Sequence, residues 1–170
     1  MKKQQKGFSL IELLIVVAII LIIAAIAIPN LIKSKMAANE AGAGGTVRTI
    51  NTAEATFQTV CSQIGYSVVL SDLNTGTGGV CPSGVGIIDT VLAAGAKGGY
   101  KYTEAGAKSA GALTNDTYNV VATPSTLGTS GNRQYCSSQT NVIYFDPLGA
   151  ACKFDTVAAG VVTPGGPNVM

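Results

Sequence analysis

The feature that most constrains this chain is an uninterrupted apolar segment near its amino terminus. Residues 13–28 read LLIVVAIILIIAAIAI, and no charged residue occurs from Leu13 to Ile32. Twenty helical residues rise by about 30 Å, which is the thickness of the hydrocarbon core of a bilayer. The segment therefore predicts one membrane-length helix. The roughly 110 residues beyond position 62 are enough to bury one modest core.

The composition excludes several classes of catalytic site. The 170 residues include 11 Lys and Arg, 9 Asp and Glu, and no His. Without His, the chain cannot form Ser-His-Asp or Cys-His nucleophilic sites, or metal sites with His ligands. The aspartates of the second half are isolated in the sequence: Asp72, Asp89, Asp116, Asp146 and Asp155. We therefore expect no enzymatic activity, no cofactor and no metal site.

The basic residues around the apolar segment predict its orientation. Lys2, Lys3 and Lys6 precede the segment, whereas Lys33 and Lys35 follow it. The positive-inside rule places the more basic flank in the cytoplasm, here by a small margin. We expect the amino terminus in the cytoplasm and the rest of the chain outside it.

An ordinary secretory signal peptide is the alternative for this segment. Ala25-Ile26-Ala27 resembles a small-residue cleavage site. However, the apolar stretch exceeds the ~7–15 residues usual for signal peptides. Pro29 would also follow the cut closely, and a carboxylate, Glu12, stands at the head of the apolar run. These features favour a retained helix.

Glu12 is costly where it stands. An ionised side chain near the membrane core costs ~2.5–3.5 kcal/mol, so such residues usually have a function. No Lys or Arg lies between Glu12 and Lys33, so this helix supplies no partner cation. Either Glu12 is shallow enough to reach the interface and has no role, or a cation comes from elsewhere.

Residues 6–17, KGFSLIELLIVV, resemble the prepilin motif of type IV pilins and type II secretion pseudopilins. A basic, a small, an aromatic and an acidic residue occur in that order before the apolar run. The resemblance implies that a prepilin peptidase cuts between Gly7 and Phe8 and methylates the new amine of Phe8. It also implies that Glu12 pairs with the amine of a neighbouring subunit during filament assembly.

The same resemblance implies an α+β fold, the type IV pilin fold, in which a long amino-terminal helix packs on a small antiparallel sheet. The implied regions are a leader at 1–7, a transmembrane and filament-core helix at 8–32, an amphipathic continuation at 33–63 and an extracytoplasmic head at 64–170. Pro29 lies where the family has a helix-bending proline.

Periodicity alone supports the second half of this helix. Its expected buried face comprises Val47, Ile50, Ala53, Phe57 and Val60. The polar residues expected on the opposite face are Arg48, Asn51, Glu54 and Gln58. The helix is expected to end near Gln63. The glycines of Ala41–Gly45 are poor helix formers, so they either end a first helix or, as the family resemblance implies, form a weak stretch within one long helix.

Beyond Gly65, turn-forming residues separate short β-rich segments. We predict antiparallel strands at 100–103, 118–123, 133–136 and 141–145. A short helix is expected at 85–94, and residues 71–79 are typical of turns. The tail around residues 164–167 is expected to be mobile.

Cys61, Cys81, Cys136 and Cys152 all lie in the predicted extracytoplasmic part. Four cysteines allow three pairings. Pairing of neighbours, Cys61 with Cys81 and Cys136 with Cys152, would contribute ~3 kcal/mol for each loop in the chain-entropy model. A Cys₄ zinc site is disfavoured, because the closely paired spacing of zinc ligands is absent. Cys136–Cys152 would also resemble the carboxy-terminal disulfide loop of pilins.

Within the family, we expect a structural subunit of a type IV pilus, with a type II secretion pseudopilin as the alternative. The resemblance implies a homo-oligomeric helical filament, assembled from the inner membrane into an extracellular pilus by a platform protein and motor ATPases. Some pseudopilins bind calcium near the carboxy terminus, but no string of ligands supports a site at Asp146 or Asp155. A rival of another class is a membrane-anchored periplasmic binding domain that never polymerises. Asn115-Asp116-Thr117 fits the weak N-glycosylation pattern.

Overall fold

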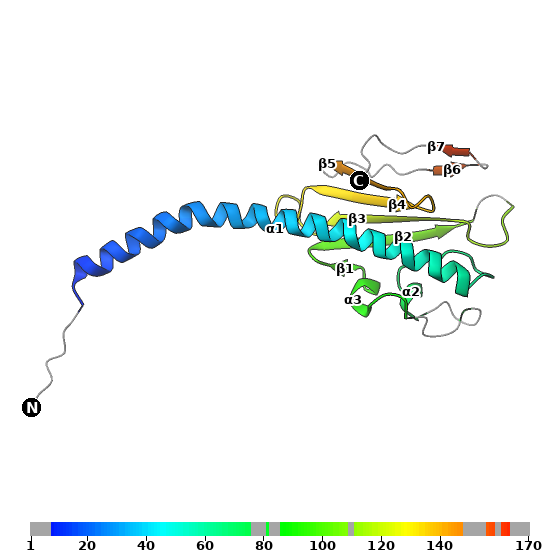
Figure 1. Cartoon of the computed structure of the whole chain (residues 1–170), viewed down its shortest axis with the longest axis horizontal. Coiled ribbons are helices and arrows are strands. Elements are labelled where there is room, and N and C mark those ends of the chain that lie inside the picture. Colours follow the sequence, from blue (N-terminus) through cyan, green and yellow to red (C-terminus); the bar gives the residue numbers. More distant parts are fainter. Residues whose placement is uncertain are drawn as a thin grey trace, which may run out of the picture. The chain divides into compact units, whose positions relative to one another are not determined.

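The computed structural model describes residues 8–75, 81, 86–108, 111–147, 156–158 and 161–163. The chain divides into two units, Met1–Lys35 and Met36–Met170. Helix α1, Leu10–Val60, begins in the first unit and ends in the second (Figure 1). The leader region 1–7 and the tail around 164–167, both named in the sequence analysis, lie outside the described residues.

Helix α1 is unbroken from end to end of its 51 residues. It continues through Pro29 and through the glycines of Ala41–Gly45, where the sequence predicts a weak stretch. Ala43 and Gly44 are buried there, and burial against the head compensates for the poor helix propensity of glycine. The helix ends at Val60, three residues before the expected end at Gln63.

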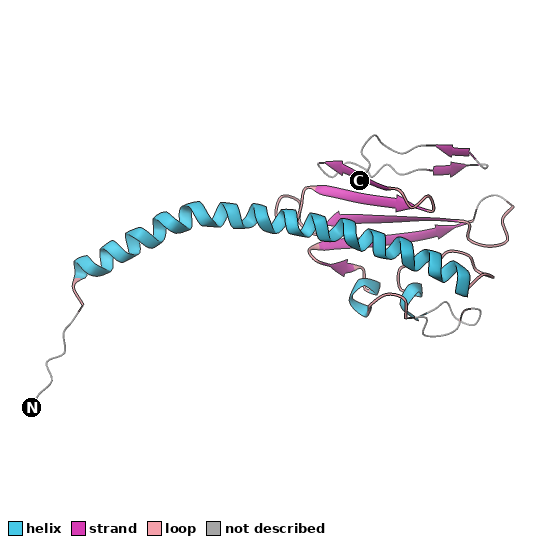
Figure 2. Cartoon of the chain, in the orientation of Figure 1, coloured by secondary structure: helices cyan, strands magenta, loops and turns pink. Residues whose placement is uncertain are grey.

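A five-stranded antiparallel sheet lies in the second unit. Its order is β1-β2-β3-β4-β5, so every strand pairs with its neighbours in the sequence (Figure 2). The strands are β1 Ala96–Lys97, β2 Tyr100–Ala107, β3 Thr117–Pro124, β4 Arg133–Ser138 and β5 Ile143–Pro147. Strands β6, Thr156–Ala158, and β7, Val161–Thr163, form a separate antiparallel pair. The four predicted strands and the α+β pilin-type fold are confirmed.

The β1–β2 hairpin depends on two glycines. Lys97 pairs with Tyr100, which leaves Gly98 and Gly99 as the loop. Both have positive φ, 60° and 78°, as a tight turn that follows the twist of the strands requires.

The core lies between the second half of α1 and one face of the sheet. Burial alternates along β3, in which Tyr118, Val120 and Ala122 are all buried. The largest apolar side chains that are fully buried are Tyr100, Tyr135, Phe57, Ile50, Leu73, Leu92, Val47 and Val120. Of the expected helix face, Val47, Ile50, Ala53 and Phe57 are buried, but Val60 is 49% exposed because the helix ends there.

Two short helices differ from the predictions. Helix α2, Asp72–Thr75, forms where turns are expected. Helix α3, Thr90–Ala93, is shorter than the predicted 85–94, because Asp89 caps its start and accepts a hydrogen bond from the Leu92 N–H at 2.8 Å. Gly95, with φ 78°, follows its end.

Cys61, directly after α1, forms a disulfide with Cys81. Their Cα atoms are 5.3 Å apart, within the normal range for a disulfide. This is the pairing expected for neighbouring cysteines. The second expected pair stays a prediction, because Cys152 lies outside the described residues.

Candidate functional site

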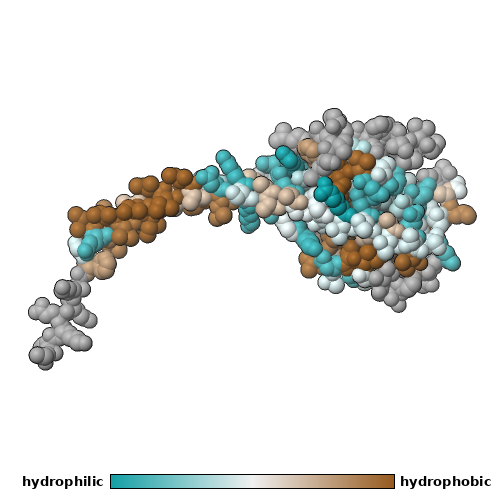
Figure 3. All heavy atoms as spheres, viewed as in Figure 1, coloured by the Kyte–Doolittle hydropathy of each residue, from teal (hydrophilic) through white to brown (hydrophobic). Residues whose placement is uncertain are grey.

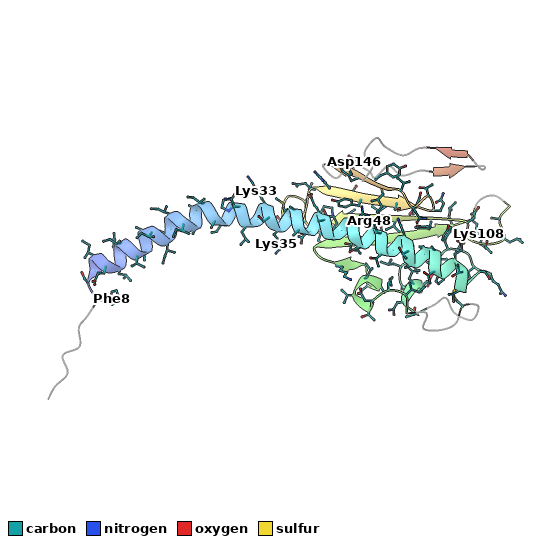
Figure 4. All side chains as sticks on the ribbon, viewed as in Figure 1. Phe8, Lys33, Lys35, Arg48, Lys108 and Asp146 are labelled. Atoms are coloured by element: carbon teal, nitrogen blue, oxygen red, sulfur yellow. A yellow bond between two sulfur atoms is a disulfide. The ribbon has the colours of Figure 1, made fainter. Side chains whose placement is uncertain are left out.

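The amino-terminal segment brings Phe8, Ser9 and Glu12 together at the start of α1. Phe8 is 83% exposed, and Figure 4 shows it at the amino-terminal end of the described helix. Glu12 lies in the first helical turn, and its Oε2 accepts a hydrogen bond from the Ser9 N–H at 3.0 Å. This is one half of a capping box. Gly7, the other residue of the predicted cleavage site, lies outside the described residues.

The Glu12 carboxylate therefore has a local role that sequence reasoning missed. The signal was present, because Ser9-Leu10-Ile11-Glu12 has the S-x-x-E pattern of a capping box. Neither of the two ion pairs within the described part of the chain includes Glu12. A carboxylate with one backbone donor can still accept a cation.

The helix beyond Glu12 exposes apolar side chains on every side. From Leu10 to Ile32 the Leu, Ile and Val side chains are all classed as exposed, with exposed fractions between 45% and 79%. This part of α1 is long and apolar enough to cross a membrane, and Figure 3 shows its visible side covered by hydrophobic side chains. A helix that is apolar all round needs a membrane or other helices around it.

The second half of α1 is anchored to the head at its start. The Asn39 side-chain amide donates to the Ser130 carbonyl at 2.9 Å. Glu40 accepts from the Asn132 N–H at 2.7 Å and lies 3.6 Å from the Arg133 Nε. These contacts fix the helix to the loop between β3 and β4 and to the first residue of β4.

Asn51 anchors the middle of the same helix to two strands. Its side-chain nitrogen donates to the Ser137 hydroxyl at 2.8 Å, and its oxygen accepts from the Tyr118 hydroxyl at 3.1 Å. Asn51 is only 6% exposed. The prediction that Asn51 and Glu54 lie on an exposed face is wrong, because both side chains find polar partners inside the head.

Glu54 is fully buried beside Ser67 and Glu104. Both the backbone N–H and the hydroxyl of Ser67 donate to the Glu54 carboxylate. Burial first, and then the adjacent Glu54 carboxyl group, raise the pKa of Glu104 far above its usual value. Burial, and then the charge of Glu54, also raise the pKa values of the Tyr66 and Tyr118 hydroxyls.

A groove runs between α1 and the start of β5, with a volume of about 680 Å³. It is lined by Arg48, Asn51, Thr52, Ala55, Asn141, Val142 and Ile143. Arg48, labelled in Figure 4, is its one charged residue. The groove pairs no nucleophile with a base.

Two weaker sequence signals, for a metal site and for glycosylation, can be compared with the described residues. No group of three or more potential metal ligands occurs among the described residues, and Asp155 lies outside them. The Asn115 side chain is 7% exposed and donates to the Tyr66 carbonyl, so the glycosylation pattern falls on a buried amide.

Comparison with known proteins bears on the amino-terminal segment. The family described as "Prokaryotic N-terminal methylation motif" matches residues 2–28. The type IV major pilin protein PilA of Myxococcus xanthus is 48% identical over 54 residues, which cover 32% of this chain and 24% of that protein. The chain is type IV pilin-like.

A second relative is also a pilus component that matches over a short segment. The type IV wide pilus major component PilA4 of Thermus thermophilus is 58% identical over 38 residues, which cover 22% of this chain and 29% of that protein. The matches thus span about a quarter of each relative. No solved structure matches the chain significantly.

Proposed function

We propose that this pilin-like chain is made as a prepilin and becomes a structural subunit of a type IV pilus, without enzymatic activity of its own. Prepilin peptidase removes residues 1–7 by cutting between Gly7 and Phe8, and the new amine of Phe8 is methylated. Residues 8–32 then form the membrane anchor and later the filament core. Residues 33–63 continue the helix, and 64–170 form the extracytoplasmic head.

The observation that carries this proposal is the exposed apolar helix with a single acid in its first turn. A helix apolar on all sides is stable in a bilayer and in a bundle of like helices. Cleavage at Gly7 would place a cationic amine four residues before Glu12 while keeping the whole helix. In a low dielectric, leaving either charge unpaired is costly. Glu12 therefore fixes the register of each subunit on its neighbour by pairing with that neighbour's Phe8 amine.

The location and partners follow from this role. Before assembly the helix spans the inner membrane with its amino terminus in the cytoplasm, and afterwards it lies within an extracellular filament. The partners are prepilin peptidase, other copies of this chain, a platform protein and motor ATPases. Both relatives are described as major pilus components, which favours a pilus subunit over a secretion pseudopilin. We also propose that the helix bends at Pro29 and that Cys136 and Cys152 form a disulfide, as the resemblance to pilins implies.

Two substitutions at one position test the proposal. Glu12→Gln keeps an oxygen that can accept from the Ser9 N–H but removes the charge, whereas Glu12→Ala removes both. We expect both variants in the membrane fraction and neither in filaments sheared from cells that have the assembly machinery. Immunoblots of the two fractions measure this. Normal filaments from Glu12→Gln would show that only the helix cap matters, and would overturn the charge-pairing mechanism.

A further inference from the structure

Glu54 and Glu104 place two carboxyl groups together between α1 and the sheet. Glu54 is on α1 and has no exposed surface. Its oxygens accept the backbone N–H of Ser67, at 3.0 Å, and the Ser67 hydroxyl. An acceptor of two donors suits an ionised carboxylate.

Glu104 meets Glu54 from β2. Tyr100 and Tyr102 of this strand are buried, and Glu104 follows at the same alternation, on the face toward the helix. Both Glu104 oxygens are buried, and neither has a hydrogen-bond partner among the described groups. A buried carboxyl group without a donor is costly when charged. A proton on Glu104 removes the charge and supplies the donor that the pair lacks.

Within the ranges that the structure describes, no positive charge pairs with either carboxyl group. The ionisable groups that act on the pair are Asp72 from α2, Tyr66 from the loop after α1, and Tyr118 from β3. All three are acidic or neutral. Neither ion pair in the described part of the chain brings a Lys or Arg to Glu54 or Glu104.

We propose that Glu54 and Glu104 form a proton-binding pair that holds α1 to β2 through one shared proton, and that the head loosens when this proton is lost. The raised pKa of Glu104, caused by burial and by Glu54, agrees with the geometry. Because the folded chain keeps a proton that the unfolded chain releases, folding weakens as the pH rises above the usual range of a carboxyl group. The proposal is independent of filament assembly, since all the groups lie in the second unit, Met36–Met170, outside the apolar segment.

Chemical unfolding of the full chain in detergent micelles, followed between pH 5 and pH 9, tests the pair. We expect the unfolding equilibrium constant of the wild type to rise by up to about tenfold per pH unit from this site. Glu104→Gln mimics the protonated acid, so it should remove this part of the pH dependence. Glu40→Gln, on the same helix, is the matched control and should keep it. Equal pH dependence in the wild type and Glu104→Gln would overturn the proposal.

Infrared difference spectroscopy provides a test that does not require Glu104→Gln to fold. In a Glu12→Gln background, which removes the acid of the membrane segment, we expect a protonated carboxyl band at neutral pH. The band should disappear in alkali. Its absence at neutral pH would overturn the proposal.

Discussion

Asn51 shows how one buried side chain can connect a helix to a sheet. Its amide nitrogen donates to the Ser137 hydroxyl, which itself donates to the Val142 carbonyl at 3.0 Å. Its amide oxygen accepts from Tyr118. The Asn51 amide therefore links α1 to β3 through Tyr118 and to β4 through Ser137. Removing Asn51 breaks both of its hydrogen bonds, although Tyr118 can still donate to Asn141 and Ser137 to Val142.

We expect Asn51→Ala to lower the free energy of unfolding by about 1–3 kcal/mol, the usual contribution of two hydrogen bonds. The matched control is Thr52→Ala, one residue along the helix. Thr52 is exposed, and its hydroxyl bonds only the Arg48 carbonyl, so we expect a change within about 0.5 kcal/mol. Urea unfolding of the full chain in detergent measures both. Equal effects would show that the Asn51 network contributes nothing.

The burial of Asn51 and Glu54 could be predicted only in part. Positions 47, 50, 51, 54 and 57 follow the three- and four-residue spacing of a single helix face. Polarity argues against burial of the two polar positions. Their partners, Ser137, Tyr118 and Ser67, come from distant parts of the chain. The sequence therefore predicted which positions share a helix face. It did not predict the hydrogen-bond partners that allow Asn51 and Glu54 to be buried.

At the scale of elements, a side chain in place of glycine would be tolerated in α1 but not in β2. Gly42 and Gly45 lie on the exposed side of α1, where an added methyl group would meet no atom within 4 Å. Gly106 of β2 lies against the backbone of Ser67 and Val68, and its N–H donates to the Val68 carbonyl at 3.2 Å. A side chain at position 106 would displace the segment whose Ser67 binds Glu54.

We expect Gly42→Ala to raise the free energy of unfolding by roughly 0.5–1 kcal/mol, because alanine loses less backbone entropy in a helix. Gly106→Ala should lower it by about 1–3 kcal/mol, because its Cβ overlaps the Ser67 carbonyl. The same unfolding measurements compare the two variants. A stabilising Gly106→Ala would show that the loop at Ser67 moves freely away from β2.

The elements themselves were largely predictable. Strands β2 to β5 were recognised because β-branched and aromatic residues are separated by turn-forming residues, which are local signals. The end of α3, one residue before the expected position 94, was also predictable, but its start at Thr90 was not, because the Asp89 cap is a feature of three-dimensional geometry. The continuity of α1 through Ala41–Gly45 depends on burial, which propensity does not report.

At the scale of the whole molecule, the continuous apolar segment of α1 and the buried core belong to different units. The large apolar side chains of residues 10–32 are all exposed, whereas the described core begins at Ala43. The apolar run was predictable because its composition alone specifies it. The capping contact between Ser9 and Glu12 was signalled by the S-x-x-E pattern, whereas the acid pair between α1 and β2 required atomic positions. Under the proposed function, maturation removes the basic leader, which changes the net charge of the chain, and it retains the apolar segment.

Removal of residues 1–7 would remove Lys2, Lys3 and Lys6 but no acid. The basic residues would fall from 11 to 8 against 9 acidic ones, so the net charge would change from +2 to −1. On isoelectric focusing in detergent, we expect the mature chain to move from a basic isoelectric point, about 8.3 for the precursor, to the acidic side of neutrality. Cells without prepilin peptidase provide the control and should retain the basic form.

Mass spectrometry of the same material identifies the cut, because the mature chain should begin at Phe8 and carry one added methyl group. Cleavage after Ala27 would instead give a product beginning at Ile28. That product would lack Glu12 and would have 8 basic and 8 acidic residues. It would therefore focus at a different position, and it would lose most of the apolar helix. Finding it would contradict the retention of the helix on which the proposed filament depends.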